Sequence, residues 1–248
     1  MYIRCERIIH TSCKDNMLGI IGAMDEEVAK IKERMTGTEV TTITGMDFCK
    51  GVLSGTPVVV VRSGIGKVNA AVCTQILVDI FHVDAVINTG IAGSLKAEID
   101  IGDIVLSTDV LHHDMDATGF GYPAGQIPRM DTLSFAADEK LLQEVKKICE
   151  QVNPEIHVHT GRVVSGDQFI SERAVKDKIV SWTKGYCTEM EGAAIAQTAY
   201  LNQIPFLIVR AISDKADDSA TMDYAEFEAK AIEHTVNLIV ATARLYSK

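Results

Sequence analysis

The sequence has no long hydrophobic run and no paired-cysteine motif. None of its apolar stretches reaches the roughly 18–20 residues that a helix needs to span a bilayer. The six cysteines are scattered without a C-x-x-C pair, which argues against a zinc site or a disulfide framework and favours free thiols in a reducing cytoplasm. Residues 1–16 contain no continuous apolar segment, so we expect neither a signal peptide nor membrane attachment.

Clusters of basic residues are also missing. Lys and Arg number 24 against 34 Asp and Glu, which gives a formal net charge of −10 at pH 7. A surface of this charge repels phosphate backbones, so we expect no nucleic-acid partner. The chain has 248 residues, of which 47% are hydrophobic and 23% charged, as is usual for a globular protein with a substantial core.

Short apolar strands and amphipathic helices alternate along the chain and predict an α/β fold. Strands are expected at residues 17–22, 40–43, 48–53, 57–62, 85–88, 103–107, 160–165 and 206–211, and helices at 25–34, 67–81, 137–151, 174–181, 189–201 and 224–246. The early hairpin-like pairs indicate a mixed sheet with helices on both faces. We expect residues 17–248 to form a single domain and residues 1–16, which resemble no element that follows, to be an extension.

Acidic residues gather at three predicted strand-to-helix junctions. They are residues 25–27, the pair Glu189 and Glu191, and Asp214. Ligands of open α/β sheets bind beyond the carboxyl ends of the strands, and separated carboxylates that converge on one cleft suit acid–base catalysis. Each group also has a structural interpretation, because acidic side chains commonly cap helices. Asp214 follows an apolar strand, so its surroundings can shift its protonation.

Two glycine-containing turns follow predicted strands. The first, SGIGK at residues 63–67, lacks the Walker pattern because Val61 and Val68 replace a required glycine and a required Ser or Thr. The dinucleotide fingerprint fails at Asn69. This segment therefore predicts a tight turn that lines a pocket. We expect the second, NTGIAG at residues 88–93, to form a similar turn whose N–H groups face a ligand.

The histidines do not form a metal-binding pattern. Residues 112–116 contain two His and two Asp, but sequence neighbours on a strand point apart. His157 and His159 share one side of a predicted strand without a third ligand nearby. The chain also lacks the G-x-S-x-G elbow of serine hydrolases. We therefore expect no metal site.

Six segments occur in an informative order. They are GIIGAMDEE (19–27), SGIGKVNAA (63–71), NTGIAG (88–93), VSGDQFI (164–170), EMEGAAIA (189–196) and RAISDKAD (210–217). Together they resemble 5'-methylthioadenosine/S-adenosylhomocysteine nucleosidases, within the wider purine nucleoside phosphorylase-like superfamily, and the resemblance covers residues 17–248. It implies a three-layer αβα fold around a mixed, partly barrel-like sheet. It also implies a cytoplasmic homodimer without a cofactor.

The same resemblance implies an activity and a set of site residues. The activity is hydrolysis of the N-glycosidic bond of 5'-methylthioadenosine, S-adenosylhomocysteine and 5'-deoxyadenosine, which releases adenine in methionine salvage. Glu27 would activate water, Glu191 would hold the ribose hydroxyls, and Asp214 would protonate N7 of the purine. The further substrate-binding residues that it implies are Met24, Ile91, Gly93, Phe169, Ile170, Met190, Ser213 and Tyr224.

Residues 111–129 form a long irregular region, and such a loop in a compact domain is commonly functional or at an interface. In the family, a loop of the second subunit closes the pocket around the 5' substituent. The residues that match this loop here are Ala117, Phe120, Tyr122 and Pro128. A dimer contact without a role in substrate binding is the alternative interpretation.

One position departs from the family, and other functions stay open. Many members have serine where this chain has Ile91, so we expect altered hydration near the nucleophile or an altered substrate preference. A phosphorylase would need cations, which Glu27 and the arginine-free segment 88–93 do not supply. Hydrolysis of another purine nucleoside such as futalosine is a second alternative. A non-catalytic nucleoside-binding protein is a third, disfavoured because all three carboxylates are present.

Overall fold

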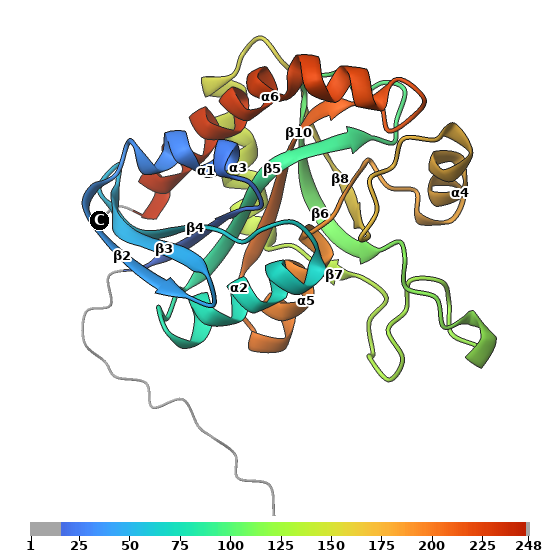
Figure 1. Cartoon of the computed structure of the whole chain (residues 1–248), viewed down its shortest axis with the longest axis horizontal. Helices are drawn as coiled ribbons and strands as arrows, with labels where there is room; N and C mark the ends of the chain where they lie inside the picture. The colour runs from blue at the N-terminus through green and yellow to red at the C-terminus, as the bar shows by residue number, and fades with distance from the viewer. Residues whose placement is uncertain (1–15, 247–248) are drawn as a thin grey trace, which may run out of the picture.

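The protein has a three-layer αβα architecture around one mixed sheet (Figure 1), as seen in a computed structural model that describes residues 16–246. The strands of this part of the chain are β1 (Leu18–Gly22), β2 (Thr36–Ile43), β3 (Met46–Leu53), β4 (Thr56–Arg62), β5 (Ala85–Ser94), β6 (Ile104–His112), β7 (Phe135–Ala136), β8 (Val158–Ser165), β9 (Cys187–Glu189) and β10 (Phe206–Asp214). The helices are α1 (Asp25–Lys32), α2 (Lys67–Asp79), α3 (Glu139–Val152), α4 (Arg173–Thr183), α5 (Gly192–Asn202) and α6 (Ala220–Ala243), with short 3-10 turns at Thr118–Phe120 and Arg244–Tyr246.

The strands form a sheet in the order β10-β6-β8-β9-β5-β1-β4-β3-β2, with β7 beside β6. A further parallel pairing of β10 with β5 closes β10, β6, β8, β9 and β5 into a barrel. Parallel pairs such as β1–β4 and antiparallel pairs such as β3–β4 both occur. The predicted α/β class, with a mixed and partly barrel-like sheet, is confirmed.

Helices cover both faces of this sheet (Figure 1). Side chains of α1, α3 and α6 enter one core, and those of α2 and α5 enter the other. The four valines of β4, residues 58–61, are fully buried, as expected for a β-branched run between two helical layers. In α3, buried Leu141, Val145 and Cys149 recur every four residues, and Asp138 caps the helix by accepting a hydrogen bond from the N–H of Leu141.

Three predicted boundaries near the later site were wrong. Strand β5 continues through residues 89–94, where we expected a turn, because it pairs with β10 from Val86 to Gly93. The helix expected from Glu189 starts at Gly192, since the short strand β9 precedes it. Strand β10 continues past Ala211 to Asp214, so that carboxyl group belongs to the end of a strand.

The described residues contain neither a membrane-spanning helix nor a group of side chains placed to bind a metal ion. Within residues 16–246, no helix is long and apolar enough to cross a bilayer. In the same residues, no group of three or more His, Cys, Asp or Glu side chains is placed to hold a metal ion. The division into an extension and one domain stays a prediction, and residues 1–15 lie outside the described residues.

Candidate active site

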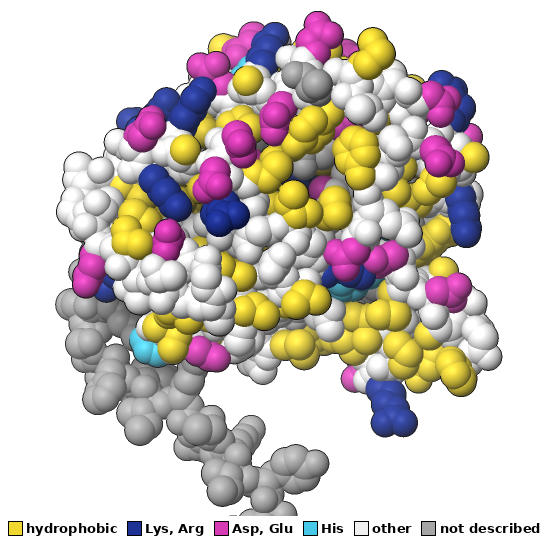
Figure 2. Space-filling view, viewed as in Figure 1, with side chains coloured by type: hydrophobic (Ala, Val, Ile, Leu, Met, Phe, Trp, Pro, Cys, Tyr) yellow, Lys and Arg dark blue, Asp and Glu magenta, His cyan; other side chains and the backbone are white. Residues whose placement is uncertain are grey.

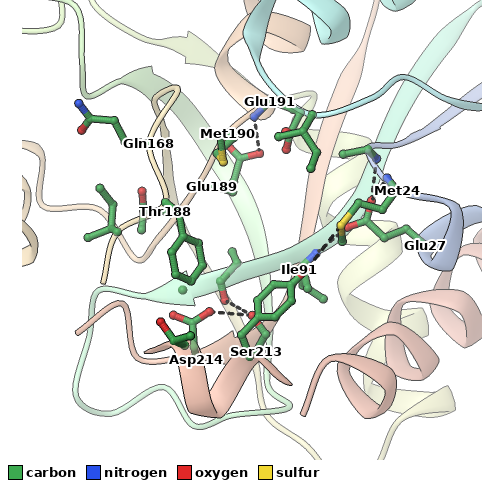
Figure 3. Close-up of a pocket in the computed structure, with 18 residues that line it drawn as sticks. Met24, Glu27, Ile91, Gln168, Thr188, Glu189, Met190, Glu191, Ser213 and Asp214 are labelled. Carbon is green, nitrogen blue, oxygen red and sulfur yellow. Dashed lines mark hydrogen bonds between the residues drawn. The ribbon is translucent and has the colours of Figure 1, made fainter. Parts of the chain in front are cut away.

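A cavity of about 470 Å³ opens where β1, β5, β9 and β10 end (Figure 3). This size is typical of a pocket for a small molecule. The sequence-predicted residues that line it are Met24, Glu27, Ile91, Gly93, Phe169, Ile170, Met190, Glu191, Ser213, Asp214 and Tyr224. Every residue predicted for the chain's own side of the pocket therefore lies at one cavity. Their individual roles stay predictions.

Glu27 lies at one side of the cavity, in the first turn of α1, and only 3% of the residue is exposed. Its Oε2 accepts hydrogen bonds from the N–H groups of Ala23 (2.6 Å) and Met24 (3.0 Å), and Oε1 accepts one from Ile91 (3.3 Å). Burial raises the pKa of Glu27, while the charge of Arg210 and these N–H groups oppose the rise. A carboxyl group held this way can accept a proton near neutral pH.

Asp214 lies on the other side of the cavity (Figure 3), at the end of β10. Its oxygens accept hydrogen bonds from the Ser213 hydroxyl and from the N–H of Ala216, each at 2.8 Å. Burial raises the pKa of Asp214, so its surroundings favour the protonated form. Gly93 is its partner in β5, and a Cβ there would lie 2.7 Å from Oδ1 of Asp214. Glycine at 93 therefore leaves the space that this carboxyl group occupies.

Glu191 occupies the position before α5, where its side chain makes no capping hydrogen bond, and it reaches the cavity from a third direction. Its Oε1 accepts a hydrogen bond from the N–H of Gly66 at 2.8 Å, which ties the turn before α2 to the site. Burial and the neighbouring charge of Glu189 raise the pKa of Glu191 to about 7. Its protonation state therefore differs from that of an ordinary surface glutamate at neutral pH.

Sequence reasoning missed an ion pair between Arg210 and Glu189 beneath the cavity. Both residues are buried, and Glu189 also accepts hydrogen bonds from the Ser165 hydroxyl and from the N–H groups of Glu191 and Gly192. Burial raises the pKa of Glu189, but the charge of Arg210 and these hydrogen bonds outweigh it and lower the pKa. Arg210 is the one charged residue in the apolar segment FLIVRAIS, a pattern that could have indicated a buried pair.

The open side of the cavity is aromatic. Phe169 is 51% exposed, and its ring meets that of Tyr224 edge to face with centroids 6.0 Å apart. The Tyr224 hydroxyl donates a hydrogen bond to Glu228 at 2.9 Å and lies 3.4 Å from the sulfur of Met24. Sequence reasoning also missed further lining residues, which are Ala23, Ile65, Ala92, Gln168, Thr188 and Thr221, whereas Glu189, which the acidic clusters had indicated, lines the cavity as well.

The residues predicted to reach a partner subunit lie elsewhere. Ala117, Phe120, Tyr122 and Pro128 do not line the cavity of their own chain. They lie in the segment between β6 and β7, which extends from the body of the molecule (Figure 1). Phe120 is 88% exposed at its 3-10 turn. The chain alone therefore leaves these four residues away from the site.

Comparison with known proteins places the chain among nucleoside-cleaving enzymes. The model of the phosphorylase superfamily matches residues 17–244. A 5'-methylthioadenosine/S-adenosylhomocysteine nucleosidase of Exiguobacterium sp. is 42% identical over 228 residues, which are 92% of this chain and 97% of the relative. The structure of the Neisseria meningitidis enzyme of that name, in complex with methylthio-immucillin-A, has a TM-score of 0.89 at 35% identity and covers 93% of this chain and 99% of its own.

A solved structure with another stated activity is also similar. Futalosine hydrolase of Helicobacter pylori has a TM-score of 0.88 at 31% identity, over 93% of this chain and 98% of its own. The fold therefore accommodates hydrolases that are named for different nucleosides.

The raised pKa of Glu191 predicts a pH-dependent cost to folding. Between pH 4.5 and about 7, the folded chain keeps a proton on Glu191 that the unfolded chain has released. The contribution of this group to the free energy of unfolding therefore falls as pH rises, by at most about 1.4 kcal/mol per pH unit. Denaturant titrations of the wild type and of Glu191→Gln should show the wild type losing stability relative to the variant across this window. The prediction would be contradicted if the free energy of unfolding of the wild type, relative to that of the variant, stayed constant or rose with pH.

Proposed function

We propose a function from the premise that the chain belongs to the phosphorylase superfamily and, within it, to the 5'-methylthioadenosine/S-adenosylhomocysteine nucleosidases. The protein is an N-glycosidic hydrolase that cleaves 5'-methylthioadenosine and S-adenosylhomocysteine and releases adenine. We infer that 5'-deoxyadenosine, which has the same base, is a further substrate. Such reactions remove by-products of methyl transfer and return the methylthio group to methionine salvage.

The charge of the cavity lining favours hydrolysis over phosphorolysis. Among the described residues that line the cavity there is no Lys, Arg or His, whereas Glu27, Glu191 and Asp214 all reach it. Arg210 lies behind this lining and is engaged by Glu189. A phosphorylase must hold a phosphate dianion beside the sugar, and these carboxylates would repel it. Water as the nucleophile needs no such cation.

On the sugar side, we assign water activation to Glu27. As the bond between C1' and N9 breaks, positive charge builds on the ribose, and a carboxylate nearby stabilises it. Water then attacks C1', and its proton passes to Glu27. We assign the ribose hydroxyls to Glu191, which lines the cavity next to Met190. Both assignments are supported by the burial of the two carboxyl groups at one cavity.

On the base side, we assign proton donation to Asp214. The electron pair of the broken bond moves onto the purine, and a proton from Asp214 to N7 lets the base leave neutral. The raised pKa of Asp214 and its hydrogen bond from Ser213 support this role. Phe169 and Ile170 would contact the purine, Gly93 would leave room for it, and Tyr224, Met24 and Ile91 would complete the ribose and 5' side.

Replacement of Asp214 tests this function. Asn cannot transfer the proton, so Asp214→Asn should lower kcat for adenine release from 5'-methylthioadenosine by about 10²–10⁴-fold while KM changes little. The assay is done in phosphate-free buffer. The matched control is Asp218→Asn in the same segment, whose side chain is 75% exposed and which should behave as the wild type.

Other outcomes of that assay would contradict the proposal. Wild-type kcat in Asp214→Asn would remove this residue from the mechanism. Release that depends on phosphate and yields ribose 1-phosphate would identify a phosphorylase. A wild type that binds adenine but releases none from any adenosine thioether would favour a nucleoside-binding protein. Preferential cleavage of futalosine would favour the second hydrolase activity.

We also infer a homodimer that works in the cytoplasm. The supporting surface is apolar: Ile65, Val68, Val72 and Phe120 are exposed by 53%, 74%, 38% and 88%. Figure 2 shows hydrophobic side chains along the face over α2 and the segment that follows β6. A patch of this kind is typical of a subunit interface, and we propose that Ala117, Phe120, Tyr122 and Pro128 complete the 5' pocket of the partner. The four described cysteines are free and buried, which suits a reducing cytoplasm.

A charge placed on that surface tests the dimer. Val68→Glu should weaken association because it buries an unpaired carboxylate in the interface. Sedimentation equilibrium should report a dimer for the wild type and a shift toward monomer for the variant, with a parallel loss of adenine release. The control is Val40→Glu on β2, where valine is 59% exposed and far from this face along the sheet order. A wild-type monomer with full activity would contradict the inference.

A further inference from the structure

The purine side of the cavity depends on a short exposed stretch of backbone. Residues 167–169 follow β8 and are exposed, whereas Gly166 before them and Ile170 after them are buried. The N–H of Gly166 donates to the carbonyl of Glu189 at 3.1 Å, and Ile170 packs into a hydrophobic cluster. Phe169, the exposed ring of the cavity mouth, therefore lies on a stretch that is anchored at its two ends.

Between these ends, the stretch is held to other segments through Asp167. The N–H of Asp167 donates to Oδ2 of Asp114 at 3.0 Å, and Oδ1 of Asp167 accepts from the N–H of Lys67 at 2.8 Å. The Lys67 ammonium donates to both oxygens of Asp114, at 2.7 Å each. Among the described residues, both hydrogen bonds that join residues 167–169 to other segments involve Asp167.

The Lys67–Asp114–Asp167 cluster is thus a closed ring of hydrogen bonds among three segments. Lys67 begins α2, Asp114 follows β6, and Asp167 follows β8. Gly66, the residue before Lys67, donates its N–H to Glu191 at 2.8 Å. Consecutive N–H groups at the start of α2 therefore bind a carboxylate on the ribose side, Glu191, and a carboxylate of the purine-side stretch, Asp167.

This ring differs from an ordinary surface ion pair. An isolated pair of exposed side chains contributes little, because each side chain must be ordered for a weak attraction. Here the Lys67 and Asp114 side chains are only 22% and 18% exposed. The carboxylates of Asp114 and Asp167 each also accept a hydrogen bond from a backbone N–H. The cluster therefore holds the backbone of these segments in place as well as pairing the charged side chains. The pKa of Asp114 is low because the Lys67 bond and the N–H of Asp167 outweigh the effect of its burial.

We propose that the Lys67–Asp114–Asp167 cluster is a positioning device that holds Phe169 and Ile170 in the conformation that binds the purine. None of its three side chains lines the cavity, so the cluster acts through the stretch it anchors. A stretch ordered before the ligand arrives does not lose that freedom on binding, which strengthens affinity without a new contact. The identity of the ligand as a purine rests on the proposed function.

Binding of free adenine tests this role without requiring catalysis. Lys67→Met and Asp114→Ala each open the ring, so isothermal titration calorimetry should show the Kd for adenine rising about 3- to 10-fold. In nucleoside cleavage, both variants should raise KM with little change in kcat. The pH profile of kcat should stay as in the wild type, because no proton-transfer group is altered. The control is Arg162→Met, which breaks a pair with Asp109 of similar exposure, 30% and 19%, on β8 and β6. It should bind adenine as the wild type does.

The outcomes separate the two proposals. Wild-type affinity for adenine in both cluster variants would overturn the positioning role, as would an equal loss in Arg162→Met. Thermal unfolding should show a cooperative transition for all three variants, and circular dichroism at the assay temperature is a second check that each is folded. A wild type that releases no adenine from nucleosides but binds it tightly would refute the hydrolase while leaving the cluster testable by Kd. A wild type that neither cleaves nor binds would overturn both.

Discussion

The site depends on one buried cation. Glu27 lies in α1, whereas Glu189 and Glu191 lie two residues apart where β9 leads into α5, and three buried carboxyl groups at one site need a compensating charge. Arg210, which is 1% exposed, supplies that charge: it pairs with Glu189, lies 3.9 Å from Glu191 and acts on Glu27 through its field. Glu189 pairs directly with Arg210, so its pKa falls. Burial still raises the pKa values of Glu191 and Glu27. One ion pair thereby sets different protonation states in one cavity.

A guanidinium and a carboxyl group can lie inside this sheet only because β5 leaves space for them. Arg210 is in register with Gly90, and Asp214 with Gly93. A Cβ at Gly90 would lie 2.6 Å from Oε1 of Glu27 and 3.1 Å from Nη1 of Arg210. The two glycines of NTGIAG therefore do not form the ligand-binding turn that we expected. They continue a strand and remove side chains where those of β10 and α1 must approach the backbone.

This difference shows what the sequence could and could not predict. Local patterns were sufficient to predict β4 and α3. A strand buried on both faces has a continuous apolar run, and a helix buried on one face has apolar residues every three or four positions. The lining residues were identified through motifs that resemble a family, since no local rule brings Glu27, Glu191 and Asp214 together from distant segments. The start of α5 was misplaced because Glu189 has a helical neighbourhood, yet pairing of β9 with β5 and β8 overrides that propensity. Arg210 was missed because its partner is apparent only once β9 and β10 are placed.

The departure at Ile91 can be interpreted from the same geometry. The structure uses the backbone N–H of this residue to hold Glu27, and any amino acid other than proline supplies that group. The side chain of Ile91 instead packs into the core beneath α1 and α6 and adds an apolar surface to the cavity wall. If the family has serine there, as the resemblance implies, the exchange would keep the N–H that holds Glu27 and remove a hydroxyl from the cavity wall. Altered hydration near the nucleophile and an altered substrate preference both stay predictions for Ile91, and both leave the N–H that holds Glu27 in place.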